Sequence, residues 1–161
     1  MYERETVADI HDGPSYGDLI VRAIYQYDNR IALIDGEAQI TYREFGVRIA
    51  QTMSIFSECG LVRGDGLAQL SRNSIDAAVT TAAAWCYGLR YTPLHPMGSL
   101  ADHTHILAES EARALVVDVA GFGAHGISLT ECGIEHVFTL GSTDDLHDLG
   151  GLREKVGAAP L

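Results

Sequence analysis

The chain has 161 residues, 47% of them hydrophobic, which is enough for one compact domain with a sizeable core. Its formal net charge of −11 argues against nucleic acid and polybasic membrane anchoring, because both need a clustered basic surface. No apolar stretch approaches the roughly 20 residues that span a bilayer, and the acidic N-terminus is unlike a secretory signal. The three cysteines form no CxxC pair. We therefore expect a cytoplasmic protein without a disulfide framework or a zinc ribbon.

The sequence predicts helices and strands that alternate steadily along the chain. In order, the predicted elements are a helix (16–27), a hairpin (31–42), a helix (42 to about 59), a strand (66–71), a helix (75–87), a strand (89–94), a helix (100 to about 110) and strands at 114–118 and 136–140. This alternation is typical of a mostly parallel sheet covered by helices, which is the α/β fold class.

Polar caps and turn residues mark the ends of these elements. The predicted helix starts are Ser15 with Asp18, Thr41 with Glu44, Ser74, and Ser99 with Asp102. Gly60 and Gly88 are natural ends for two of the helices. Asp35-Gly36 between two short apolar runs predicts a β-hairpin closed by a type I′ turn.

The last twenty residues, 141–161, are acidic, glycine-rich and weakly periodic. They predict a surface loop or linker, with a domain edge near residue 150. The expected organisation is an N-terminal extension at 1–14, an α/β subdomain at 15–150 and a linker at 151–161.

A glycine motif follows the predicted strand at 114–118. Residues 121–126 spell G-x-G-x-x-G, as in the fingerprint of proteins that bind NAD or NADP. That fingerprint opens a long helix and is followed about 20 residues later by an acid that holds the ribose. Here Gly133 interrupts after about two turns, and the strand at 136–140 ends in glycine and serine. We therefore interpret the motif as a connection at the end of the sheet.

Other chemistry-bearing side chains fit structural roles better than catalytic ones. Asp102, His103 and His105 do not form a metal site, because positions two apart on a helix point to different faces, and we expect a solvated face there. Cys59 and Cys86 lie near helix ends in apolar settings and are interpreted as small buried hydrophobes. No nucleophile elbow or phosphate loop surrounds the remaining candidates, which are Ser71, Ser74, Ser110 and Lys155. The residues alone predict no catalytic and no metal-binding side chain.

Four short elements occur in order, at compatible spacing, along residues 17–140. They are 41-TYREF-45, then Gly64-Asp65 with Arg72-Asn73-Ser74, then 84-AWCYGLRYTPLHP-96, then 110-SEARA-114 with Asp118. Together they closely resemble the N-terminal part of the AMP-forming adenylate-forming superfamily, which holds acyl-CoA synthetases, luciferases and the adenylation domains of peptide synthetases. The resemblance implies the first N-terminal subdomain of an acyl-CoA synthetase-like fold.

Some positions depart from the family pattern. Gly66 stands where a basic residue is usual. Met97 stands where some relatives use a basic residue to hold a phosphate of coenzyme A, so the resemblance assigns His95 and Met97 only to the rim of the channel. The family's phosphate loop, of the type [ST]SGTTGxPK, does not occur in these 161 residues, and we expect a fragment.

The resemblance implies a fatty-acid or related carboxylate–CoA ligase that makes an acyl adenylate and then acyl-CoA. The resemblance thus implies ATP, Mg²⁺ and coenzyme A as cofactors of the full-length enzyme, and none of them is expected to bind this chain tightly. No catalytic residue is expected in this chain. The expected partners are the remainder of its own polypeptide, the fatty acid, and a second copy in a homodimer of the fragment. The alternatives are an amino-acid adenylation domain, a stand-alone interaction module and an NAD(P)-binding protein.

Overall fold

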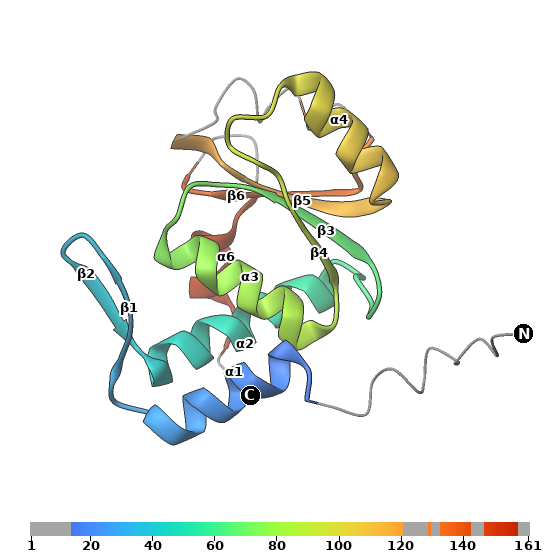
Figure 1. Ribbon diagram of the computed structural model, residues 1–161. Helices are drawn as coiled ribbons and strands as arrows, with labels where there is room; N and C mark the ends of the chain where they lie inside the picture. The colour runs from blue at the N-terminus through green and yellow to red at the C-terminus, as the bar shows by residue number, and fades with distance from the viewer. Residues whose placement is uncertain (1–13, 121–128, 130–132, 143–146, 158–161) are drawn as a thin grey trace, which may run out of the picture.

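The chain folds into a five-stranded parallel sheet with helices on both faces, beside a separate two-stranded antiparallel hairpin (Figure 1). The computed structural model describes residues 14–120, 129, 133–142 and 147–157. The helices are α1 (Tyr16–Tyr27), α2 (Tyr42–Glu58), α3 (Ile75–Tyr87), α4 (Leu100–Glu109) and α6 (Leu149–Lys155). The strands are β1 (Ile31–Asp35), β2 (Ala38–Thr41), β3 (Gly66–Leu70), β4 (Arg90–Pro93), β5 (Ala112–Asp118), β6 (His136–Leu140) and β7 (His147–Asp148). The predicted α/β fold class is confirmed.

Polar caps begin the helices at the positions that the sequence predicted. In three capping boxes the cap hydroxyl accepts from the third amide of the helix, and the carboxylate of that third residue accepts from the cap amide. These pairs are Ser15 with Asp18, Thr41 with Glu44, and Ser99 with Asp102. The Ser74 hydroxyl accepts from the Ala77 amide at the start of α3. Gly88 ends α3 with a φ of 84°, a left-handed conformation that favours glycine.

The β1–β2 hairpin is present, but its turn is not the predicted type I′. Asp35 pairs with Ala38, so the central residues of the turn are Gly36 and Glu37. Of these two only Gly36 has a positive φ, of 60°, whereas a type I′ turn needs a positive φ at both. Glycine at the first central position is typical of a type II′ turn. The Asp35-Gly36 signal therefore located the hairpin and misplaced its turn by one residue.

Alternate residues of the strands enter two hydrophobic layers. Leu67 of β3 and Val116 of β5 pack in the larger layer with residues of α2 and α3. Leu70 and Leu115 enter the smaller layer, which includes Leu107 of α4. Figure 1 shows α4 on one side of the sheet and α1, α2 and α3 on the other. Because both faces are covered, every residue of β3 is buried, as is typical of parallel sheets.

The strand order, β4-β3-β5-β6-β7, places a crossover point between β3 and β5. The chain leaves β3 through α3 to reach β4 on one side, and then returns through α4 to β5 on the other side of β3. In open α/β sheets, ligands bind outside the carboxyl ends of the strands where the connections diverge in this way. The carboxyl ends of β3 and its neighbours are therefore the expected location of a site.

The surface loop predicted for the tail, 141–161, is wrong for 147–157. That stretch contains β7, which pairs with β6, and α6, which begins at a cap formed by Asp148. Leu149 is fully buried and Arg153 is 6% exposed. Two consecutive glycines at the start of α6 hide the helical pattern, because glycine weakens a helix that tertiary packing then stabilises. The domain limits themselves stay a prediction.

Two glycines allow neighbouring elements to approach closely. A Cβ on Gly17 of α1 would lie 3.0 Å from both the Cys86 Cα and the Trp85 carbonyl oxygen of α3. A Cβ on Gly66 of β3 would lie 2.7 Å from the Glu111 carbonyl oxygen. A side chain at this position would therefore collide with the backbone at the start of β5.

Candidate functional site

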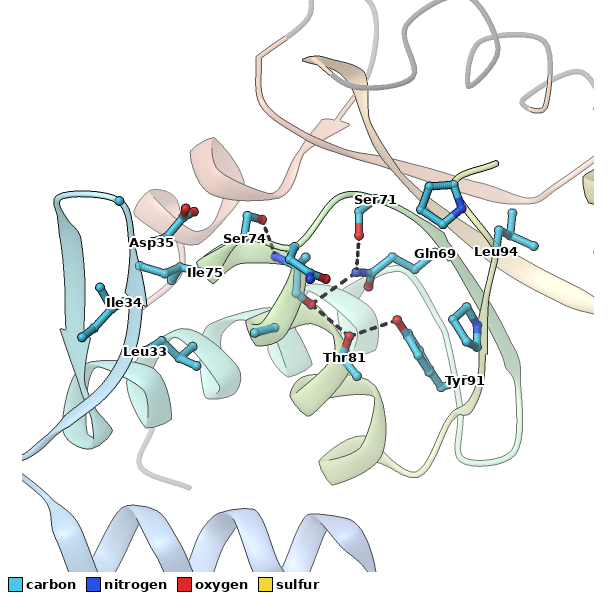
Figure 2. A pocket seen from close by; sticks show the side chains of 16 residues that line it. Leu33, Ile34, Asp35, Gln69, Ser71, Ser74, Ile75, Thr81, Tyr91 and Leu94 are labelled. Atoms are coloured by element: carbon cyan, nitrogen blue, oxygen red, sulfur yellow. Dashed lines mark hydrogen bonds between the residues drawn. The ribbon is translucent and has the colours of Figure 1, made fainter. Parts of the chain in front are cut away.

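A cavity of about 600 Å³ lies at the carboxyl ends of β3 and β4, beside the first turns of α3 (Figure 2). Its size falls within the range of small-molecule sites, and its place is where parallel sheets bind ligands. Figure 2 shows the hairpin on one side of it and β4 on the other. Side chains from four elements meet here, among them Leu33, Ile34, Gln69, Ser74, Tyr91 and Leu94.

Gln69 is a buried polar side chain in the wall of this cavity, and it is 4% exposed. Its Nε2 donates to the Ser71 hydroxyl at 2.8 Å and to the Ala77 carbonyl oxygen at 3.3 Å. A carbonyl oxygen can only accept, so the bond to Ala77 fixes which end of the amide is nitrogen. The Gln69 Oε1 is buried and has no hydrogen-bond partner among the described residues. The cavity wall therefore holds an acceptor that lacks a donor.

An aromatic row runs from α1 across α3 to the edge of the cavity. Tyr16 stacks on Trp85 with ring centroids 5.2 Å apart, and Trp85 meets Tyr91 edge-on at 5.9 Å. The Tyr91 hydroxyl lies 3.0 Å from the Thr81 hydroxyl. Burial raises the pKa of Tyr91, against a smaller opposite effect of the hydrogen bond with Thr81. Tyr91 therefore presents a neutral phenol to the cavity near neutral pH.

The cavity carries little charge. Among the described residues no lysine, arginine or histidine lines it, and its one charged lining residue is Asp35. Phosphates are bound by cationic side chains or by several converging amides, and Mg²⁺ takes six oxygen ligands, commonly from carboxylates and phosphates. The side chains of this cavity therefore do not fit ATP, Mg²⁺ or the phosphates of coenzyme A.

An ion pair joins the ends of β3 and β5 at the crossover point. Asp118, the last residue of β5, accepts from the Arg72 Nε at 2.8 Å and from its Nη2 at 3.4 Å. The Asp118 side chain is 10% exposed and that of Arg72 is 60% exposed. The hydrogen bond to Asp118 raises the pKa of Arg72. The guanidinium next to β3 is therefore engaged within the chain, where it ties two strands together.

The residues assigned to the channel rim lie in the loop after β4 and do not line the cavity. Met97 is 87% exposed, and its amide donates to the His95 Nδ1 at 3.1 Å. The His103 Nε2 of α4 lies 2.8 Å from the His95 carbonyl oxygen. These contacts hold the loop at the edge of the sheet, and the rim role stays a prediction.

The solvated face expected around His103 and His105 is wrong for His103. His103 is 1% exposed, whereas His105 is exposed. The imidazole fits because Gly98 has no side chain: a Cβ there would lie 2.8 Å from the His103 Cδ2. Within the part of the chain that the structure describes, no three His, Cys, Asp or Glu side chains gather as a metal site requires.

Cys59 and Cys86 are free, half-buried thiols. Burial raises the pKa of both thiols, that of Cys86 to about 11, so little thiolate forms near neutral pH. Ser74 is the cap of α3, and Lys155 is the last residue of α6. Cys132 and the G-x-G-x-x-G stretch lie outside the described residues.

Sequence reasoning missed Gln69 and the pairing of Arg72 with Asp118. The signal for Gln69 was a single polar residue in the apolar strand 66-GLAQL-70, because a strand buried on both faces has no solvent for an amide. The ion pair left no local signal, since its partners are 46 positions apart.

The parallel sheet, the attached hairpin and their order along the chain define an α/β domain with the fold of adenylate-forming enzymes. A benzoate–CoA ligase from Burkholderia xenovorans LB400 has this fold, with a TM-score of 0.76 and 18% identity, over 92% of this chain and 29% of that one. The chain belongs to the AMP-binding enzyme family, whose model matches residues 20–155.

Two further proteins resemble this chain, one in sequence and one in fold. The medium/long-chain-fatty-acid–CoA ligase FadD8 of Mycobacterium tuberculosis is 28% identical over 149 residues, which is 90% of this chain and 26% of that ligase. NpsA-ThdA of Klebsiella oxytoca, an artificially fused adenylation–PCP di-domain, shares the fold with a TM-score of 0.72 and 18% identity, over 95% of this chain and 26% of that one. The chain thus spans about a quarter of the length of FadD8. No helix among the described residues is both long and apolar enough to cross a membrane.

Proposed function

We propose that this chain is the N-terminal part of an ATP-dependent, AMP-forming ligase that joins a fatty acid or a related carboxylate to coenzyme A. The observation that carries the proposal is the likeness to a fatty-acid–CoA ligase over 90% of this chain. The whole protein would form an acyl adenylate and pyrophosphate from the carboxylate and ATP, and would then transfer the acyl group to the thiol of coenzyme A.

Within that protein the described residues act as a scaffold. Charge that develops on phosphates during such a reaction is stabilised by cations. The large cavity has no cationic lining side chain among the described residues, and the arginine that follows β3, Arg72, is held by Asp118. We therefore assign ATP and Mg²⁺ to the remainder of the polypeptide, which is the proposed partner of this chain.

We place His95 and Met97 at the rim of the channel through which the thiol reaches the acyl group. The position of their loop, directly after β4 at the carboxyl edge of the sheet, supports this assignment. Met97 carries no charge, so no phosphate of coenzyme A is held there. The free thiols of Cys59 and Cys86 support a cytoplasmic location. We also propose a homodimer of the isolated chain, through apolar surface that the remainder of the polypeptide would cover.

Pyrophosphate release tests this proposal. The isolated chain is incubated with ATP, Mg²⁺, palmitate and coenzyme A, and no release above a protein-free control is expected. The longer protein that contains this chain is expected to release pyrophosphate only when the fatty acid is present. Turnover by the isolated chain would contradict the scaffold role, and a longer protein that ignores fatty acids would contradict the ligase assignment.

Amino-acid adenylation is the second candidate function. It is favoured by the shared fold with the adenylation–PCP di-domain, which covers 95% of this chain. The same assay separates the two functions when palmitate is replaced by a mixture of amino acids. Release that depends on amino acids and not on fatty acids would establish the second candidate.

A further inference from the structure

We propose that α1 is a flap: it opens as a unit while the rest of the domain stays folded, and its opening exposes the Cys86 thiol and the groove beside it. Once lifted, this helix of 12 residues loses its internal hydrogen bonds, because a helix of that length is marginal in water without a partner. The flap is a property of the fold and does not depend on the ligase activity proposed above.

α1 buries much less of itself than the two helices on which it lies. Figure 1 shows it as the outermost helix on its side of the sheet. Gly17 is its one buried residue of 12, whereas α2 buries six of its 17 residues and α3 buries seven of its 13. Ile20 and Ile24 are only partly buried against the core, and Tyr16 is 69% exposed. Because segments with few buried apolar contacts open first, α1 is expected to open before α2 and α3.

A groove of about 490 Å³ lies beside α1 and is lined by side chains of α1, α2 and α3. Val21, Met53 and Tyr87 line it, one from each helix. An unfilled space beside a helix forfeits packing contacts, so α1 is held less firmly than a helix in a close-packed core. Cys86 lines the same groove, and its Sγ lies 3.9 Å from the Gly17 carbonyl oxygen. The backbone of α1 therefore covers this thiol in the closed state.

Asp28 supplies the hinge at the carboxyl end of α1. Its backbone, with a φ of 30° and a ψ of −84°, lies outside the regions that residues other than glycine ordinarily adopt, so the junction is strained. The Asp28 side chain accepts from the Arg43 Nη2, and its carbonyl oxygen accepts from the Arg43 amide at 2.8 Å. These bonds anchor the junction to the start of α2. A lifted α1 keeps this anchor and relieves the strain.

The Cys86 thiol reports the opening. Burial, and to a lesser extent the charge of Asp18 in the first turn of α1, raises the pKa of this thiol to about 11. A lifted α1 takes Asp18 away and lets water reach the sulfur, so the thiolate forms more readily in the open state. A maleimide attached to a bulky polymer needs free approach to the sulfur, and it therefore labels Cys86 through the open state.

Native-state hydrogen exchange of the full chain, in urea too dilute to unfold it, tests the flap. The amides of residues 20–27 are expected to exchange together, with protection factors at least about tenfold lower than those of α3 and with a weaker dependence on urea. Equal protection and equal urea dependence in α1 and α3 would overturn the proposal, because α1 would then open only with the whole domain. A gradual rise in protection along α1 would also overturn it, because that pattern is fraying of one end.

Three variants, each in a chain whose other two cysteines are replaced, separate local from global opening. Ile24→Ala removes partly buried contacts of α1 and is expected to speed maleimide labelling of Cys86 about tenfold. Gln26→Ala, at an exposed position of the same helix, is the matched control and leaves labelling unchanged. Val117→Ala destabilises the whole domain from the smaller hydrophobic layer and is also expected to leave labelling unchanged. Equal acceleration by Ile24→Ala and Val117→Ala, or none by Ile24→Ala, would refute the flap, and neither result bears on pyrophosphate release.

Discussion

Replacing Gly17 with alanine tests the contact between α1 and α3, which anchors the N-terminal helix to the domain. Gly17 is the one buried residue of α1, and it lies against the backbone of α3 at Trp85 and Cys86. A methyl group at this position has no free space, so Gly17→Ala forces the two helices apart.

The size of the effect follows from the geometry. The new Cβ would lie 3.0 Å from two backbone atoms of α3, which cannot rotate away as the end of a side chain would. Overpacking of this kind costs about 1–3 kcal/mol, whereas alanine in place of glycine in a helix gains about 0.5–1 kcal/mol. We expect a net loss of about 1 kcal/mol in the free energy of unfolding, and a Tm lower by roughly 2–4 °C for a chain of this size.

Thermal and urea unfolding followed by circular dichroism measure this loss. Gly151→Ala is the matched control, because Gly151 also lies in the first turn of a helix and a Cβ there would meet only Asp148 Oδ2, at an ordinary 3.5 Å. That control is expected to be as stable as the parent or slightly more stable. A Gly17→Ala variant that unfolds at or above the Tm of the parent would refute the close packing of α1 on α3.

Three further predictions concern single side chains. The backbone amide of Thr41, and to a lesser extent its hydroxyl, donates to the Glu44 carboxylate and holds the pKa of Glu44 below its ordinary 4.5, so the carboxylate stabilises the fold above pH 4.5 and loses this effect as the pH falls through the folded pKa. The difference in unfolding free energy between the protein and Glu44→Gln, measured in urea, should therefore shrink from about pH 6 to about pH 3. A difference that stays constant over this range would contradict the prediction. Burial raises the pKa of Cys86 to about 11 from an ordinary 9.0, so the native protein holds about a hundredfold less of the reactive thiolate at pH 8 than the unfolded protein. In a variant without the other cysteines, iodoacetamide should therefore react about a hundredfold more slowly with the native protein. Equal rates would contradict the burial of Cys86. Gly98→Ala crowds the buried His103 ring and is expected to lower the free energy of unfolding by about 1–3 kcal/mol and to shift the NMR signals of the imidazole. An unchanged NMR spectrum would disprove this contact.

The boundaries of the helices could be predicted because they depend on neighbouring residues. Ser99 and Asp102 bond to each other across three positions, and Gly88 takes a φ that other residues avoid, so both signals lie within a few letters of the sequence. The same local logic located the hairpin. It misplaced the turn because the register of Asp35 with Ala38, and not the Asp-Gly pair, decides which residues are central.

Features that depend on distant partners could not be predicted in the same way. The start of α6 has two glycines, and its stability comes from burying Leu149 and Arg153 against the rest of the domain. His103 reads as a surface residue until Gly98 and the His95 carbonyl are brought beside it. The cavity beside Gln69 likewise depends on residues far apart in the sequence, since the hairpin and β4 form its opposite sides.

Pyrophosphate release that depends on a fatty acid, measured side by side for the isolated chain and for the longer protein that contains it, tests the central claim most directly. The proposed role as the scaffold of a carboxylate–CoA ligase predicts no release by the isolated chain and fatty-acid-dependent release by the longer protein. Release by the isolated chain, or a longer protein that responds to no carboxylate, would contradict it.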